Sequence, residues 1–233
     1  MSAGLLAVTA VDAELAAVVR DLGPAGPCRV GPYDGVALRT AAGELVVVAG
    51  GVGMAAAAAA AATGLALLPG CAAVLCLGIA GGFDGRAAPG DVVVATEMVG
   101  ADLGAWSPAS PESPGGFLTL AELVLGETVL PAGPGAAALA ARAGGVAGPI
   151  LTVAAVTGSD ERAGELARRW GACAEAMEGF GVAVAARPYG RPVYEVRAIS
   201  NACGRRDRAA WDVPGALDAL SRASARLFAE ELS

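Results

Sequence analysis

Short apolar runs recur along the chain and predict buried β-strands. Each run holds five to seven residues, is rich in Val, Ile, Leu or Ala, and ends at glycine or polar residues. Runs of this kind are typical of strands covered on both faces, as in sheets with parallel strands. The predicted strands are residues 5–10, 44–49, 72–77, 91–95, 150–156 and 193–199.

Segments with helical spacing separate these runs. Asp12–Arg20 predicts a helix with Asp12 as its N-cap, and Ser159–Trp170 predicts a helix capped by Ser159. Further helices are expected at residues 52–68, within 131–149, at 179–186, and at 214–230 with Leu217, Leu220, Leu227 and Phe228 inward. Strands alternating with helices predict an α/β fold, with a largely parallel or mixed sheet. No break in composition marks a second domain, so residues 1–233 are predicted to form a single domain.

Two segments allow more than one interpretation. Residues 52–68 are apolar apart from Thr63, but they are mostly alanine and include Gly53 and Gly64. A membrane span needs roughly 20 strongly apolar residues, so a buried helix is favoured. Residues 107–116 are rich in Pro, Ser and Gly and predict a loop long enough to form a flap over a site.

Composition narrows the chemistry. Of 233 residues 55% are hydrophobic, and the formal net charge is −7 with no basic run, so neither nucleic acid nor an anionic membrane is an expected partner. The absence of histidine excludes Ser-His and Cys-His catalysis and favours a carboxylate as acid or base. Five cysteines form no CxxC pair, and Cys71, Cys76 and Cys173 lie in apolar surroundings. These cysteines, and an N-terminus that lacks the basic region of a signal peptide, predict that the protein resides in a reducing cytoplasm.

A glycine-rich turn follows the second predicted strand. Residues 51–56, Gly-Val-Gly-Met-Ala-Ala, fit the G-x-G-x-x-G/A pattern of dinucleotide-binding folds. That pattern also needs an acid at the end of the next strand, and none occurs there before Asp84. NAD binding is therefore disfavoured. A tight turn with close packing, or backbone N–H groups that face a different ligand, remain as interpretations.

Three separated segments place polar groups where a strand meets its loop. They are Ala10–Leu15 (Ala-Val-Asp-Ala-Glu-Leu), Ala176–Gly179 (Ala-Met-Glu-Gly) and Arg197–Asn201 (Arg-Ala-Ile-Ser-Asn). Ligands bind at such strand ends in open α/β proteins. With residues 78–82 (Gly-Ile-Ala-Gly-Gly) and 89–93 (Pro-Gly-Asp-Val-Val), the order and spacing of these segments resemble the purine nucleosidase and phosphorylase superfamily. The resemblance spans nearly the whole chain and implies a central twisted mixed sheet flanked by helices and a homodimer or higher homo-oligomer.

The resemblance also implies roles for particular residues. Glu14 stands where the hydrolases of the superfamily carry the glutamate that deprotonates the attacking water, whereas Asp12 should face away from the site. Met177 and Glu178 match the pair that holds the ribose hydroxyls. Arg197 matches an arginine that helps to hold the water, although an ordinary buried ion pair is an alternative. Further substrate contacts are expected at Val52, Ile79, Ala80 and Gly81.

The nucleophile divides the superfamily. Its phosphorylases commonly carry arginine and serine near the second glycine turn, whereas residues 77–82 contain neither, so water is expected as nucleophile. The methylthioadenosine nucleosidases usually carry serine where this chain has Ile79, so one of their water contacts is missing. Neither a metal nor an organic cofactor is expected.

Asn201 is expected to read the purine edge and stabilise the leaving base. Relatives that act on adenine carry aspartate here, whereas an amide can donate to a 6-oxo group and accept from a ring N–H. An ionised aspartate facing a 6-oxo group would bring acceptors together and leave them unpaired, which costs about 1–3 kcal/mol per unsatisfied group. Asn201 therefore favours a 6-oxopurine. Together with the segments 156–162 and 200–212, it makes the chain resemble the futalosine hydrolases, which release hypoxanthine from a 5′-substituted inosine on a route to menaquinone.

The benzoate-bearing 5′ chain of such a substrate would need a cation, and Trp211 could stack on its ring. The candidates are Arg162, Arg205, Arg206 and Arg208, although a solvated basic face is the simpler interpretation. Methylthioadenosine/S-adenosylhomocysteine nucleosidase, inosine phosphorylase and a non-catalytic nucleoside-binding module are the alternative functions. Asn201 disfavours the first, the missing phosphate donors the second, and the paired Glu14 and Glu178 the third.

Overall fold

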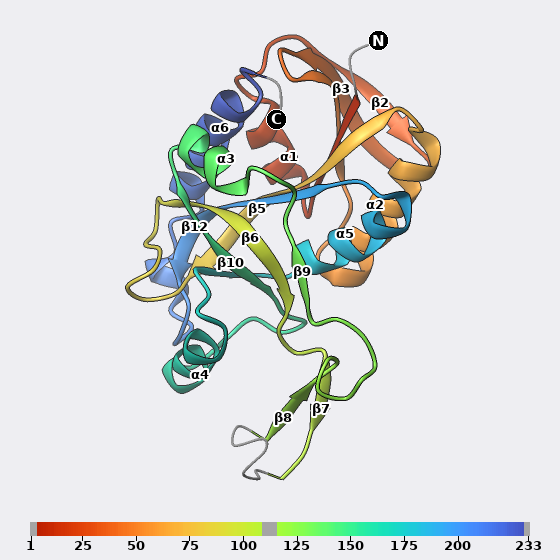
Figure 1. Ribbon diagram of the computed structural model, residues 1–233. Coiled ribbons are helices and arrows are strands. Elements are labelled where there is room, and N and C mark those ends of the chain that lie inside the picture. The colour runs from red at the N-terminus through yellow and green to blue at the C-terminus, as the bar shows by residue number, and fades with distance from the viewer. Residues whose placement is uncertain (1–3, 109–115, 231–233) are drawn as a thin grey trace.

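The computed structural model describes residues 4–108 and 116–230, which form an α/β fold around a ten-stranded mixed sheet (Figure 1). The strand order is β11-β10-β6-β12-β5-β1-β4-β3-β2, with β9 paired to β6. This confirms the predicted fold class. The strands are β1 (Gly4–Thr9), β2 (Ala25–Val30), β3 (Tyr33–Thr40), β4 (Gly43–Ala49), β5 (Cys71–Gly82), β6 (Val92–Gly100), β9 (Val129–Pro131), β10 (Val146–Thr152), β11 (Ala174–Ala176) and β12 (Val193–Ala202).

The centre of the sheet is parallel, and β6, β10 and β11 form a second parallel group that runs antiparallel to the centre. Strands β4, β1, β5 and β12 run in the same direction, so their carboxyl ends meet at one edge. The hairpin β2–β3 adds to β4 antiparallel, and β6 pairs antiparallel with β12. Strand β11 pairs with β10 on one side and with the end of β5 on the other, so this part of the sheet closes on itself.

Four strands differ from the prediction by more than one residue, and one of them, β6, continues beyond residue 95 to Gly100. Strands β5 and β12 continue beyond residues 77 and 199, because Gly78 pairs with Arg197 and Gly81 with Asn201. Gly78 was wrongly expected to end its strand. Strand β10 lies four residues earlier than predicted, since a register irregularity between Gly148 and Ile150 lets it pass Pro149. The hairpin β2–β3 and the short β7 (Gly104–Trp106), β8 (Phe117–Thr119), β9 and β11 were not foreseen.

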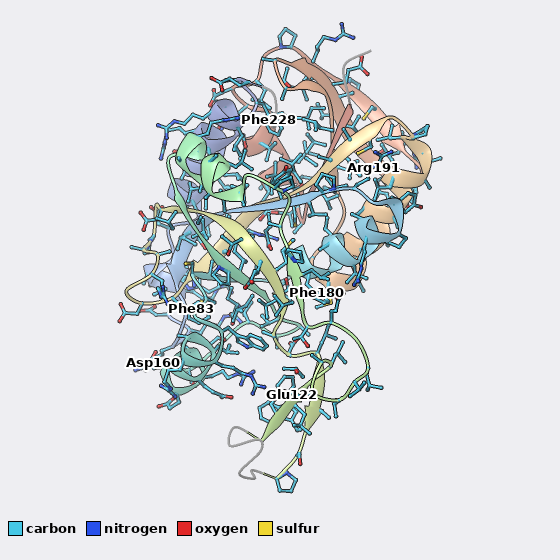
Figure 2. All side chains as sticks on the ribbon, viewed as in Figure 1. Phe83, Glu122, Asp160, Phe180, Arg191 and Phe228 are labelled. Atoms are coloured by element: carbon cyan, nitrogen blue, oxygen red, sulfur yellow. The ribbon has the colours of Figure 1, made fainter. Side chains whose placement is uncertain are left out.

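Within the described part of the chain, six α-helices cover the sheet: α1 (Asp12–Val19), α2 (Met54–Leu67), α3 (Ala136–Ala143), α4 (Asp160–Trp170), α5 (Gly179–Ala186) and α6 (Val213–Leu227). Helices α2 and α5 pack on one face of the sheet, and α1, α3 and α6 on the other (Figure 1). Helix α4 packs on a smaller third cluster that contains Phe83 and Leu151. Phe83, Phe180 and Phe228, labelled in Figure 2, each belong to a different one of these clusters.

Most of the predicted helical detail is confirmed. Ser159 caps α4 by accepting from the backbone N–H of Arg162, and Leu220, Leu227 and Phe228 of the last helical segment are buried, with Leu217 partly buried. Asp12, however, does not cap α1. Val11 is the N-cap, in extended conformation, and Asp12 is already helical and exposed. An acid in the first turn still favours the helix through its dipole.

The alanine-rich segment forms α2, whose Ala57, Ala60, Ala61 and Leu65 are buried, as predicted. Within residues 4–108 and 116–230, no helix is both long and apolar enough to cross a membrane. The proposed flap lies mostly outside the described residues, since 109–115 are not among them. Its two ends meet where Ser107 donates to the carbonyl of Gly116, next to the β7–β8 hairpin (Figure 1).

Candidate active site

The carboxyl ends of the four central strands bring together the segments that the sequence singled out. Residues 10–14 follow β1, residues 50–53 follow β4, residues 78–82 end β5, and residues 197–201 end β12. Residues 177–178 join them from the turn between β11 and α5. The candidate site is therefore built by topology from segments up to 190 residues apart in sequence.

Glu14 is buried and bound at both oxygens. Its Oε1 accepts from the backbone N–H of Ile79 at 2.8 Å, and its Oε2 accepts from Ala10 N at 2.9 Å and Val11 N at 3.3 Å. Glu14 thus closes the first turn of α1, which Asp12 was expected to do, and ties this helix to the end of β5. Asp12 points away, as the spacing of the two acids predicted.

Glu178 stands at the N-cap of α5 and binds the glycine turn. Its Oε1 accepts from Gly53 N at 3.0 Å, and its Oε2 accepts from Met177 N at 3.2 Å. Both Gly51 and Gly53 have φ near +100°, a conformation that glycine adopts readily and other residues rarely do. The turn that resembles a dinucleotide motif therefore presents the backbone N–H of Gly53 to Glu178.

Arg197 joins the two glutamates. Its guanidinium is 1% exposed and lies 3.1 Å from Glu178 Oε2 through Nη2. Its Nη1 faces the carbonyl of Ile79 at 3.5 Å. A Cβ placed on Gly78 would lie 2.6 Å from both Arg197 Nη1 and Glu14 Oε1. Glycine at position 78 therefore leaves the space in which this arginine and this carboxylate approach each other.

Burial sets the acidity of Glu14. Removal from water raises its pKa above the ordinary value near 4.5, and the charge of Arg197 together with the N–H groups of Ile79 and Ala10 opposes this rise. The nearby Glu178 raises the pKa further. A carboxylate with raised pKa is a better proton acceptor than an ordinary glutamate, which suits a general base.

Asn201 lies at the end of β12 and is partly exposed. Its Oδ1 lies 2.8 Å from Ser200 Oγ, and its Nδ2 donates to the carbonyl of Ala202 at 3.0 Å. A side-chain amide has two donors and two acceptor lone pairs, so one donor and one lone pair remain for a ligand. The buried Ser200 Oγ also lies 3.2 Å from Ala80 O of β5, so two acceptors compete for its single proton, and Asn201 Oδ1 is the nearer.

The other residues predicted to contact substrate differ in how far they are buried. Ile79 and Gly81 are partly buried and Ala80 is buried, all within β5 rather than after it. Val52 is 58% exposed at the glycine turn, and Met177 is partly buried beside Glu178.

The cations proposed for the 5′ chain are not gathered at these carboxylates. Arg206 and Arg208 both lie over the ring of Trp211, at 5.5 and 6.0 Å. Arg205 is exposed, while Arg162 pairs with Glu165 and lies over Trp106. Arg205 is nevertheless anchored, because its backbone N–H donates to Asp160, which Figure 2 labels at the start of α4.

Sequence reasoning missed two buried acids. Glu195 is fully buried in β12 and binds Arg197, and Glu175 is buried in β11 and binds Thr157. The signal for Glu195 was an acid inside an apolar strand two residues before an arginine, which places both on one face. Among the described residues, no group of three or more Cys, Asp or Glu is placed to hold a metal ion.

Comparison with known proteins identifies the class. The sequence matches the family described as the phosphorylase superfamily over residues 5–232, and the chain therefore belongs to it. It is 46% identical to the futalosine hydrolase of Acidothermus cellulolyticus over 237 residues, which cover 98% of this chain and 92% of that protein. Identity to the futalosine hydrolase of Thermus thermophilus is 40%, over 67% of this chain and 69% of that protein. The chain thus belongs to the futalosine hydrolase family and is an N-glycosidic hydrolase, as the resemblance implied.

Solved structures share the fold. A methylthioadenosine/S-adenosylhomocysteine nucleosidase from Neisseria meningitidis gives a TM-score of 0.79 at 19% identity, over 97% of this chain and 99% of that one. The futalosine hydrolase of Helicobacter pylori gives 0.78 at 20% identity, over 97% and 96% of the two chains. At this level of identity the likeness concerns the fold.

Proposed function

We propose that the chain hydrolyses the N-glycosidic bond of futalosine and releases hypoxanthine, on the futalosine route to menaquinone. The observation that carries the proposal is the pair of buried carboxylates, Glu14 and Glu178, on either side of Arg197 at the carboxyl end of the sheet. Family membership supports the substrate, and the side-chain chemistry described below supports the reaction.

Glu178 is the residue proposed to hold the ribose. Its two oxygens accept from Gly53, Met177 and Arg197, which leaves acceptor capacity on a carboxylate with about four lone-pair positions. The 2′- and 3′-hydroxyls of a ribose can donate to that remaining capacity. Because the glycine turn and Arg197 already fix Glu178, binding the sugar requires little ordering of the side chain.

Glu14 is the residue proposed to activate water. As the bond between C1′ and the base nitrogen stretches, the ribose gains positive charge and water attacks C1′. Glu14 takes a proton from this water, the new C1′–O bond forms, and the electrons of the broken bond leave with the base. The base takes up a proton from solvent at N7, and Glu14 later releases its proton to solvent, so that one water is consumed overall and a free sugar and hypoxanthine are produced.

Asn201 is the residue proposed to bind the leaving base. Its unused donor and lone pair match the 6-oxo acceptor and a ring N–H of hypoxanthine. Ionised aspartate in this place would offer acceptors alone. The hydrogen bond from Ser200 Oγ to Asn201 Oδ1 supports this role, because it orients the amide.

We also propose that the protein assembles as a homodimer or larger oligomer. A groove of about 520 Å³ runs beside the site and is lined almost wholly by apolar residues. Its lining includes Met54, next to Gly53, and Phe180, two residues after Glu178. The exposed Val184 on the same helix extends this apolar face, which a second copy of the chain would cover. The five cysteines are free thiols, which supports placing the protein in the cytoplasm.

The decisive experiment incubates the purified protein with futalosine, with and without phosphate, and separates the products by chromatography. Hypoxanthine is expected at equal rates in both conditions, together with the free sugar. Strict dependence on phosphate, with a sugar 1-phosphate as product, would overturn the hydrolytic proposal. Faster release of adenine from the 6-amino analogue would overturn the assignment of the base.

A further inference from the structure

Glu195 is a buried carboxylate to which the reaction described above gives no role. It is 0% exposed near the start of β12, and its Oε1 accepts from Arg197 Nε at 2.9 Å. Its Oε2 has no hydrogen-bond partner within the described part of the chain. A buried carboxylate with an unpartnered oxygen is destabilising by itself, so a compensating function is a reasonable expectation.

The contacts of Arg197 show what Glu195 does to the guanidinium. This planar group has five N–H donors in a rigid fork. Glu195 takes the Nε donor, Nη2 faces Glu178 and also donates to Cys76 Sγ at 3.1 Å, and Nη1 faces Ile79 O and the space over Gly78. Fixing the Nε edge therefore fixes the direction of both Nη groups.

Competition for the single guanidinium explains why such a restraint is needed. Glu14, Glu178 and Glu195 all influence Arg197 electrostatically. A bidentate pair with either site glutamate would draw Arg197 toward that glutamate and away from the other. Glu195 holds it on the side remote from Gly78, so neither Glu14 nor Glu178 captures the whole fork.

The glycine after Glu178 gives a second link. A Cβ on Gly179 would overlap the carboxylate of Glu195, so this carboxylate lies directly against the backbone of the first turn of α5. Glu195 thus touches both Arg197 and the residue that follows Glu178. Glu195 therefore lies between Arg197 and the backbone next to Glu178, the two parts of the site whose relative position must be kept.

We propose that Glu195 is a positioning residue, which anchors Arg197 by its Nε edge so that the Nη groups serve Glu178 and the space beside Glu14. This inference rests on the proposed function for its consequence in catalysis. Its structural part concerns the buried cluster alone and is testable without substrate.

The charge balance of the cluster agrees with this role. Burial raises the pKa of Glu195 to about 7, Arg197 opposes the rise and Glu178 adds to it. The other group that faces it is Cys76 of β5, whose own pKa burial raises well above the usual range. Strand β6, paired with β12 on its other side, contributes Val92, Val93 and Val94. Near neutral pH Glu195 therefore holds a proton for part of the time, which limits the excess of negative charge around Arg197.

The test compares two substitutions. Glu195→Gln keeps an acceptor for Nε but cannot titrate, whereas Glu195→Met fills a similar volume and accepts nothing. We expect Glu195→Met to lower kcat on futalosine about 10–100-fold, the cost of a small misplacement in a site, and Glu195→Gln to retain kcat within about threefold. Equal rates in the Gln and Met variants, or a folded Met variant with normal kcat, would overturn the proposal.

A second measurement needs no substrate and remains informative if Glu195→Met fails to fold or futalosine is not hydrolysed. Because the folded-state pKa of Glu195 is raised, folded chains keep a proton between about pH 5 and 7 that unfolded chains have lost. The unfolding constant of the native chain should therefore rise, relative to that of Glu195→Gln, by up to about tenfold per pH unit over this range. Parallel curves for the two proteins would show that Glu195 does not titrate as part of the cluster. Glu44→Gln, which removes an exposed carboxylate paired with Arg39, is the matched control and should leave both readouts unchanged.

Discussion

Glu14 combines a structural and a chemical property in one side chain. Its oxygens satisfy three backbone N–H groups, from Ala10, Val11 and Ile79, which hold the carboxylate at the junction of α1 and β5. Burial nevertheless raises its pKa, since removal from water outweighs these hydrogen bonds and the charge of Arg197. Hydrogen bonds therefore fix the position of Glu14, and burial leaves its carboxylate able to accept a proton.

Glu14→Gln tests this property directly. The amide keeps the size of the side chain but accepts no proton, so kcat should fall about 10²–10⁴-fold, the usual contribution of a general base, while KM changes little. Steady-state kinetics on futalosine measure both quantities. Asp12→Asn, which changes the exposed acid of the same helical turn, is the matched control. Near-normal turnover in Glu14→Gln would remove Glu14 from the reaction.

The acidic limb of activity depends on the same carboxylate. Glu14 must be ionised to accept a proton, and its pKa lies above 4.5 because of burial. We expect kcat/KM to fall as the pH decreases through this raised pKa, with a midpoint above 4.5. A pH–rate profile measures the midpoint, and full activity at pH 4.5 would contradict the assignment.

Asn201→Asp tests recognition of the base. Aspartate would place an acceptor against the 6-oxo group, so activity should shift from futalosine toward its 6-amino analogue. We expect the ratio of kcat/KM values to change by about 10–10³-fold, less than the roughly 10⁴-fold of fully mismatched polar sites, because aspartate can protonate and donate. An unchanged ratio would show that Asn201 does not contact the purine edge.

At the scale of elements, the connection between β10 and α4 is fixed at several points. Glu175 of β11 accepts from Thr157 N at 2.7 Å and from Thr157 Oγ1 at 2.5 Å. Asp102 accepts from Ala154 N, and Asp160 at the start of α4 accepts from Arg205 N. The connection is thereby tied to the segment that follows Asn201.

Thr157→Val measures the strength of this attachment. The substitution removes the hydroxyl donor from the buried Glu175, and an unsatisfied buried acceptor of this kind costs about 1–3 kcal/mol. The free energy of unfolding, from urea denaturation, should decrease by that amount. Thr40→Val removes a hydroxyl contact to a backbone carbonyl, that of Gly43, rather than to a buried carboxylate, and should cost less. Equal losses of unfolding free energy in the two variants would mean that the hydrogen bond from Thr157 to Glu175 stabilises the fold no more than an ordinary turn contact.

Local sequence predicted those elements whose signals are local. The six apolar runs predicted β1, β4, β5, β6, β10 and β12, although not all of their bounds, and Ser159 marked the start of α4, because a cap and a buried run depend on neighbours in sequence. The segments Ala10–Leu15 and Arg197–Asn201 were correctly expected at strand ends, since parallel strands place these ends together. Ala176–Gly179 was correctly expected to open a helix, although β11, which precedes it, runs antiparallel to β5.

Features that depend on distant partners escaped prediction. Gly78 lies inside the strand that ends in Gly82, and glycine is needed there because the side chains of Glu14 and Arg197 occupy the space that a Cβ would need. The hairpin β2–β3 is half exposed and contains Pro27, so its strands lack an apolar run. The pairing of Glu195 with Arg197 was visible as a spacing, but its burial follows from the helices packed on the sheet.

At the scale of the whole molecule, the apolar groove beside the site predicts self-association. Val184→Glu would place a charge on this face, where Val184 is 47% exposed, and should raise the dissociation constant of the oligomer at least about tenfold. Light scattering during gel filtration measures the mass, which we expect to fall toward 22.6 kDa in the variant. Val146→Glu changes a valine of similar exposure outside the groove and serves as control. A monomeric native protein would contradict the prediction.

The closure of the sheet through β11 has a consequence for the order of assembly. Glu175 of β11 pairs with Gly81, nearly a hundred residues earlier in the chain, and Ala176 pairs with Thr152 of β10. Such distant pairings form slowly, because the intervening chain must first lose much of its freedom. The residues that follow β11 are Met177 and Glu178. During synthesis and folding, Glu178, the carboxylate proposed to hold the ribose, is therefore expected to reach its place among the last parts of the molecule. A nascent or partly folded chain is then expected to lack activity until the ring of strands is complete.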